Sequence, residues 1–437
     1  MKAGFAQVDF TPPYGYMPGE FQGYFAQGAH LPLCANTGAF GEGESTVILI
    51  AADYMQFPTH YADTIRKMVA EATGVALDHI TLAASHTHMS CSSPDNCWKC
   101  PGEPEIAAVV AKRIVQSAVE ALADRKEVTL SAGITEEKRF SFCRDWVLKD
   151  GTVKCNPGYN RDDLDHTCIT PDYRVNVMKV EHEGKLAAIM VNYANHPDTH
   201  WGKDRTKFSP EWPGFMRKAL QEKYGEDVKV LFFNGACGDI NDRDFGFKSD
   251  INGGHRDPSV NPPEVIGNGL ADTISKLMDT LPAGCGKGEV KVIARSVTVN
   301  RRQITEREVA WATETLKKAE DTYLSCPEYG TAEAFMRLSR NVPETEEFYL
   351  QAIKIGPWAI VAMPGEIYTE LGLLVKAGSP FEHTVISELT NGSHGYVIPD
   401  RVRENGSYEG RFSSGSTGFG ACDVIVAGAL DMLKKLK

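Results

Sequence analysis

The sequence predicts an α/β protein in which mixed, mostly buried sheets are flanked by helices. Two observations support this fold class. Short runs of β-branched and aromatic residues, each long enough for one strand, alternate with longer segments of helical periodicity. The strand-like runs are apolar almost throughout, which is typical of strands that are covered on both faces.

The expected elements follow one another along the chain. The run 45–54 predicts a buried strand, and 59–74 after it predicts a helix. In the segment 104–126 the apolar residues Ile106, Val110 and Ile114 recur at the spacing of one helix face, with Val109 beside them. Further strands are predicted within 79–88, 185–197, 228–239 and 358–366, and further helices within 262–281 and 366–378.

No internal repeat and no Pro/Ser/Gly-rich linker divides the 437 residues. We therefore expect a single domain over 1–437, although this length would allow several. A charged helical segment at about 305–340 is expected to leave this domain and return to it.

Composition excludes several classes of protein. The formal net charge of −12 argues against nucleic acid as a partner. No stretch of about 18 apolar residues is present, so we expect no stable membrane association. The N-terminus lacks the pattern of a secretion signal, and the 11 cysteines are scattered, which favours reduced thiols in the cytoplasm. A homo-oligomer is compatible with this composition.

Polar residues follow the ends of several apolar runs. In α/β proteins the carboxyl ends of strands are where chemistry is usually assembled, so we expect these residues to converge on one site. They are Asp53, His86, His88, His196, Asp239 and Glu366.

The stretch "ASHTHMSCSSPDNCWKC" contains two kinds of metal ligand. His86 and His88 lie two apart, which in an extended chain puts both rings on one face, with Cα atoms about 6.6 Å apart. With His196 and Glu366 they would make the N/O ligand set of a catalytic zinc with an open position. The alternative is a structural zinc on the cysteines, Cys91, Cys97 and Cys100, but a second C-x-x-C is missing.

Six short motifs occur in an order that resembles the neutral ceramidase family, in its catalytic domain and nearly end to end. They are "AGFAQVDFTPPYG", "SHTH", "NYANHP", "GACGDIN", "MPGE" and "GYV…YEG". The resemblance implies one zinc ion held by His86, His196, Glu366 and Tyr396. It also implies that His88 and Tyr408 face the substrate, together with an arginine that matches Arg144 better than Arg161.

The sequence departs from the family at two places. Asn241 stands where the family's ceramidases have a serine that has been proposed as nucleophile, and an amide cannot take that role. The chain also ends soon after the tyrosine motif, so we expect no C-terminal immunoglobulin-like domain. With neither a secretion signal nor this accessory domain expected, a long-chain lipid at a membrane surface is not the expected substrate.

The expected function is therefore a zinc-dependent hydrolase that cleaves an amide or ester bond of a small soluble molecule. His88 is the expected general base or acid, because an imidazole titrates near neutral pH. Tyr408 and Arg144 would stabilise the oxyanion, and the Asn241 amide could donate to it. Asp239 would orient a ligand histidine or cap a turn. The alternative is a metal-dependent lyase acting on a sugar or hydroxy acid.

Overall fold

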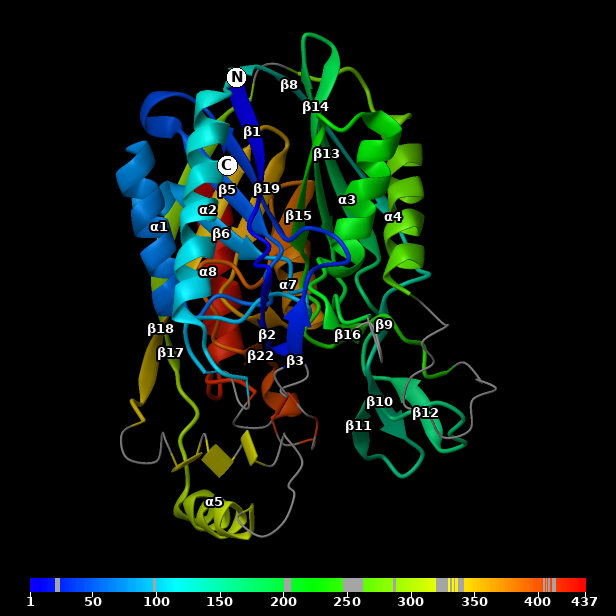
Figure 1. Cartoon of the computed structure of the whole chain (residues 1–437). Coiled ribbons are helices and arrows are strands. Elements are labelled where there is room, and N and C mark those ends of the chain that lie inside the picture. The colour runs from blue at the N-terminus through cyan, green and yellow to red at the C-terminus, as the bar shows by residue number, and fades with distance from the viewer. Residues whose placement is uncertain are drawn as a thin grey trace.

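Three mixed sheets form the centre of the molecule, as the computed structural model in Figure 1 shows. The first sheet has the order β6-β5-β4-β1-β7, the second β15-β14-β13-β8 and the third β17-β18-β19-β21. The structure describes residues 1–19, 24–96, 100–199, 206–246, 262–285, 288–319, 329–330, 332–333, 335–336, 342–403, 405, 407, 409–410 and 414–437.

The strands of these sheets have the following bounds. The first sheet consists of β1 (Lys2–Asp9), β4 (Cys34–Phe40), β5 (Val47–Ala52), β6 (Ile80–Ala84) and β7 (Lys126–Glu127). The second consists of β8 (Thr129–Glu136), β13 (Arg174–His182), β14 (Lys185–Tyr193) and β15 (Lys229–Asn234). The third consists of β17 (Val290–Asn300), β18 (Thr345–Ile355), β19 (Trp358–Ala362) and β21 (His383–Ser387).

Each sheet contains one parallel pair of strands joined by a crossover helix. These pairs are β5 with β6, β14 with β15, and β19 with β21, whereas the other pairings within the three sheets are antiparallel. The crossovers contain α1 (Thr59–Thr73), α3 (Glu211–Tyr224) and α7 (Thr369–Gly378) respectively. The predicted α/β class with mixed, buried sheets is confirmed.

The three sheets share one apolar core, and each covers its other face with helices. Buried residues of all three sheets, among them Leu49, Met190 and Ile360, belong to one cluster. The helices α1 and α2 (Pro104–Ala123) cover the first sheet, α3 and α4 (Pro263–Met278) the second, and α7 and α8 (Ala421–Leu436) the third. Burial on both faces explains why these strands are apolar almost throughout. On α2, Val110 and Ile114 are buried as expected, whereas Val109 is 55% exposed.

Four small sheets lie beyond the ends of the long strands (Figure 1). They pair β2 (Tyr14–Met17) with β3 (Tyr24–Gln27), β9 (Phe142–Cys143) with β16 (Ile240–Asn241), and β20 (Glu366–Ile367) with β22 (Tyr396–Val397). The fourth contains β10 (Asp145–Leu148), β11 (Val153–Cys155) and β12 (Leu164–Thr167).

The charged segment at 305–340 leaves and re-enters the fold through one hairpin. Asn300 at the end of β17 pairs with Thr345 at the start of β18, and α5 (Glu306–Ala319) lies between them in sequence. Most of 320–341 falls outside the described residues. That the chain is one domain, without a C-terminal immunoglobulin-like domain, stays a prediction. Among the described residues, no helix is both long and apolar enough to cross a membrane.

Candidate metal centre

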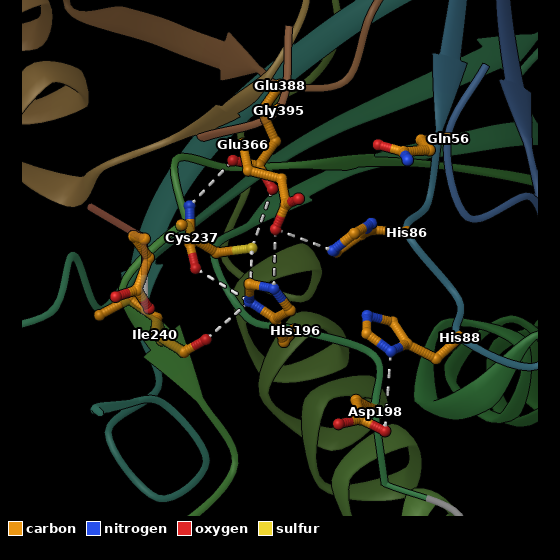
Figure 2. Close-up of polar contacts among 12 residues, drawn as sticks. Gln56, His86, His88, His196, Asp198, Cys237, Ile240, Glu366, Glu388 and Gly395 are labelled. Carbon is orange, nitrogen blue, oxygen red and sulfur yellow. Dashed lines mark hydrogen bonds and ion pairs between the residues drawn. The ribbon is translucent and has the colours of Figure 1, made fainter. Parts of the chain in front are cut away.

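The three parallel strand pairs bring the predicted ligands to one place. His86 follows β6, His196 follows β14, and Glu366 follows β19, so each residue comes from a different sheet. Each lies just beyond the carboxyl end of a strand that belongs to a parallel pair, where α/β folds usually build their sites. Their side chains point toward one another in Figure 2.

The ring of His86 is oriented by the main chain. Its Nδ1 lies 2.9 Å from the carbonyl oxygen of Met55, which can only accept, so Nδ1 carries the proton. The residue itself has a φ of 74°, a left-handed conformation that is uncommon for a residue with a side chain. Such outliers cluster at functional sites, where the surrounding structure holds them.

The ring of His196 is oriented in the same way. Its Nδ1 lies 2.9 Å from the carbonyl oxygen of Cys237 and 2.8 Å from that of Ile240. In both histidines, therefore, Nδ1 is the donor and Nε2 presents a lone pair.

Three acceptor atoms consequently meet at one point. Glu366 Oε2 lies 3.3 Å from His86 Nε2 and 3.2 Å from His196 Nε2 (Figure 2). His86 Nε2 is buried without a hydrogen-bond partner among the described residues. A single proton could form a hydrogen bond across only one of these two contacts. A cation between the three acceptor atoms could bind all of them. The residues present therefore fit a metal ion, and the N/O donor set suits zinc.

The pKa values of Glu366, His196 and His86 reflect how closely these three buried groups lie together. Burial favours the neutral form of Glu366, but His86 and His196 outweigh it and hold the pKa of that carboxyl well below its usual range. Burial lowers the pKa of His196 to about 3, so its imidazole stays neutral. At His86 burial also acts to lower the pKa, but Glu366 raises it. A neutral imidazole beside an ionised carboxylate is the state in which both bind metals.

Tyr396 lies beside Glu366 through strand pairing. β20 and β22 run parallel, and Glu366 is the register partner of Tyr396, which is buried. Neighbouring strands are about 4.8 Å apart, so this register makes Tyr396 a close neighbour of the ligand Glu366. The register supports Tyr396 as the fourth ligand, which stays a prediction.

His88 lies beside the two ligand histidines. Its ring centroid is 4.9 Å from that of His86 and 6.0 Å from that of His196. Its Nδ1 lies 3.9 Å from Asp198 Oδ1, a carboxylate that the sequence analysis did not single out (Figure 2). One ring nitrogen from each of the three histidines lies within 4.8 Å of the others, so His88 is also placed as a rival ligand to Glu366.

Arg144 is close to Tyr396, but much of its donor capacity is used. Its Nε donates to Glu409 Oε1 at 2.8 Å and its Nη2 to the carbonyl oxygen of Gly238 at 2.7 Å. The guanidinium carbon lies 5.3 Å from the Tyr396 ring centroid. Arg161, the competing match, donates to Asp163 Oδ1 at 2.7 Å.

The amide of Asn241 is engaged by its own surroundings. Its Nδ2 donates to Asn156 Oδ1 at 2.7 Å, and its Oδ1 accepts from the amide of Arg243 at 3.0 Å. The expected donation to an oxyanion would use the second proton of Nδ2.

Two of the predicted polar residues have structural roles instead. The prediction that Asp53 belongs to the centre is wrong. Its carboxylate accepts hydrogen bonds from Arg217 Nη2 and from the amide of Cys34, each at 2.8 Å. Asp239 accepts from both the amide and the hydroxyl of Thr369, at 2.9 and 2.7 Å. It therefore caps the first turn of α7, and the carbonyl groups described above orient the histidines.

The structure describes two of the three cysteines of the alternative zinc site, and it does not describe one of the predicted tyrosines. Tyr408 and Cys97 lie outside the described residues. Cys91 and Cys100 are buried free thiols, and burial raises the pKa of both.

One buried carboxylate behind the centre was missed by the sequence analysis. Glu388 Oε2 accepts from the amides of Cys237 and Ile367, at 3.1 and 2.9 Å, and its Oε1 accepts from the Cys237 thiol at 2.9 Å. Burial raises its pKa to about 7. It fixes the backbone beside both His196 and Glu366. Its position just past the apolar run 383–387 is the signal that could have revealed it.

Comparison with known proteins identifies the fold. No family model and no curated protein matches the chain. A solved structure of neutral ceramidase from Pseudomonas aeruginosa matches with a TM-score of 0.72 and 17% identity, covering 100% of this chain and 74% of that one. A structure of a ceramidase complexed with C2 matches with a TM-score of 0.72 and 16% identity, covering 100% and 75%. The chain therefore has the fold of the neutral ceramidases, as the order of its motifs predicted.

Proposed function

We propose that the chain is a zinc-dependent hydrolase that cleaves an amide, or an ester, of a small soluble substrate. The observation that supports this most is the convergence of three acceptor atoms. Glu366 Oε2 lies 3.3 Å from His86 Nε2 and 3.2 Å from His196 Nε2. With Tyr396 they would hold one zinc ion. Such an ion supplies a Lewis acid that polarises a carbonyl and lowers the pKa of water to about 7.

The other residues of the centre would handle the proton and the substrate. His88 would take a proton from the attacking water and return it to the leaving group. Asp198, near His88 Nδ1, would favour the charged form of that imidazole in between. Arg144, held by Glu409, would keep positive charge beside Tyr396 and the developing oxyanion. Tyr408 would donate to the same oxygen.

A polar substrate fits this centre better than a long apolar chain. A carboxylate, Asp198, lies within reach of the proton-transfer group, and its side chain is 20% exposed. Asn241 provides no nucleophile, so water would attack the carbonyl directly. The amide is suggested by the likeness to ceramidases. The proposed location is the cytoplasm, because the scattered cysteines favour reduced thiols.

Metal analysis tests the ligand assignment. Purified wild-type protein is expected to contain zinc that His86→Ala and His196→Ala each lose, because each substitution removes one of few ligands. His166→Ala is the matched control, since that exposed histidine pairs with its exposed neighbour Asp165. Unchanged zinc content in both ligand variants, with the fold intact by circular dichroism, would contradict the assignment.

A substrate panel tests the reaction. N-acyl amino acids, acetylated sugars and simple esters are expected to be hydrolysed, with both products recovered. Conversion of sugars or hydroxy acids to unsaturated products, without hydrolysis of any member of the panel, would favour the lyase alternative.

A further inference from the structure

A second cluster of potential ligands includes Glu409, the carboxylate that accepts from Arg144. Asp145 and Cys155 are register partners in the antiparallel pair β10–β11 (Figure 1), so their side chains leave the same face of that hairpin. Glu409 joins them from a segment 254 residues away in sequence. One ligand atom from each of the three residues lies within 4.8 Å of the other two.

The two carboxylates share an unusual pattern of contacts. Asp145 Oδ2 accepts from the Tyr368 hydroxyl at 2.9 Å, and Glu409 Oε1 accepts from Arg144 Nε at 2.8 Å. The other oxygen of each group, Asp145 Oδ1 and Glu409 Oε2, is buried and has no hydrogen-bond partner among the described residues. Asp145 and Glu409 are only 2% and 1% exposed. One oxygen held by a donor and the other left for the ion is how protein carboxylates bind a metal through a single oxygen.

The charges of the cluster do not balance without a further positive charge. Arg144 offsets one of the two carboxylates, and leaving the second charge buried and uncompensated would be costly. A proton on Asp145 or a bound cation would each supply the missing charge.

The thiol of Cys155 decides between these two alternatives. Its Sγ lies 3.4 Å from Glu409 Oε1, to which it donates. In the shared-proton state the thiol stays protonated, donates to Glu409 Oε1 and contributes nothing to the charge balance. A divalent ion uses all three groups, and thiolate with carboxylate oxygen is a ligand set that zinc accepts.

We propose that Asp145, Cys155 and Glu409 form a second metal site that binds a thiophilic divalent ion such as zinc. Three anionic ligands are then balanced by the ion and by the guanidinium of Arg144. Binding forms one sulfur–metal and two oxygen–metal bonds, and it releases the Cys155 proton and any proton on Asp145 to solvent. The site shares no ligand with the centre at His86 and His196, so it does not depend on the proposed hydrolase activity.

Cobalt(II) tests this site without any assay of activity. Metal-free, reduced protein carrying both His86→Ala and His196→Ala is titrated with cobalt while its absorption spectrum is followed. A near-ultraviolet band from sulfur-to-cobalt charge transfer is expected, because only a thiolate ligand produces it. Adding Cys155→Ser should abolish the band, whereas Cys168→Ser should keep it. Cys168 is the matched control, since it is also half-buried and its amide contacts the carbonyl oxygen of Asp145.

A second variant keeps the test independent of the cysteine substitution. Asp145→Asn retains the thiolate, so the band should keep its position while cobalt binds several-fold more weakly. The proposal is overturned if folded protein shows no such band, or if the band survives Cys155→Ser, which would place the thiolate at other cysteines. Loss of zinc from the His86 centre leaves these readings unchanged, so failure of either proposal can be recognised separately.

Discussion

At the scale of single residues, the centre depends on which ring nitrogen faces inward. Carbonyl oxygens of Met55, Cys237 and Ile240 take the Nδ1 protons of His86 and His196. Both Nε2 atoms must then face Glu366 as acceptors. The same reasoning does not fix the role of His88, whose Nδ1 lies 3.9 Å from Asp198 Oδ1.

His88→Ala separates the roles of general base and ligand. If His88 transfers protons, the variant should keep its zinc and lose turnover by about 10²- to 10⁴-fold, the usual contribution of a positioned acid–base group. Zinc content and kcat are measured on the same preparation, with His166→Ala as the control. Loss of zinc in His88→Ala would instead make it the third histidine ligand.

Residue types at strand ends predicted the centre only where the chemistry was specific. His86, His196 and Glu366 were predicted as ligands and do converge. Asp53 had the same position after an apolar run, but it pairs with Arg217 from α3, a contact that depends on packing between elements. Single-sequence patterns contain no information about such distant partners.

At the scale of elements, three β-α-β units set the geometry. The predicted strands and helices of these units were found, because long apolar runs and clear periodicity are strong local signals. The helix α3 was not predicted. Its first turns contain Trp212, Pro213 and Gly214, which obscure the helical pattern, although proline is tolerated in the first turn. The short pairings β9–β16 and β20–β22 have two residues per strand and no periodicity to detect.

A buried ion pair ties α7 to the start of β13 and should make stability depend on pH. Asp172 Oδ2 lies 2.7 Å from Lys376 Nζ, and both side chains are less than 10% exposed, at 9% and 7%. Burial acts to raise the pKa of Asp172, but Lys376, together with Arg174, outweighs it and lowers the pKa below 3.8. The contribution of the pair is therefore complete above that ordinary value and is lost as the pH falls through the lower, folded-state value.

Asp172→Asn should thus destabilise the protein by about 3 kcal/mol at pH 7, because it leaves a buried lysine without its partner. The difference from wild type should shrink below about pH 4 as Asp172 becomes neutral in both. Urea unfolding between pH 7 and pH 3 measures it. Asp431→Asn, at an exposed pair with Lys435, is the control and should change little. A difference that stays constant to pH 3 would refute the ion-pair argument.

At the scale of the whole molecule, the centre joins the three sheets. Its predicted ligands follow strands of different sheets, so a bound ion would link parts of the chain that are up to 310 residues apart, from His86 to Tyr396. An ion that binds only the folded state adds free energy of unfolding, about 4 kcal/mol at a concentration 1,000 times its Kd.

Removal of the metal should consequently lower the melting temperature. Wild-type protein treated with a chelator is expected to melt below the zinc-loaded form, and returning zinc should restore it. His86→Ala should show a much smaller response, apart from any contribution of the second site. Identical melting curves for the loaded and chelated wild type would contradict a link between metal and fold.

The carbonyl contacts of the ligand histidines also have an evolutionary consequence. Where a carboxylate side chain orients a metal-binding histidine, one mutation can delete it. A main-chain carbonyl is present in every amino acid, so no substitution at Met55, Cys237 or Ile240 removes the acceptor itself. The orientation of both rings is thus inherited with the backbone: a substitution at one of these positions can change the packing around the centre but not the supply of acceptors.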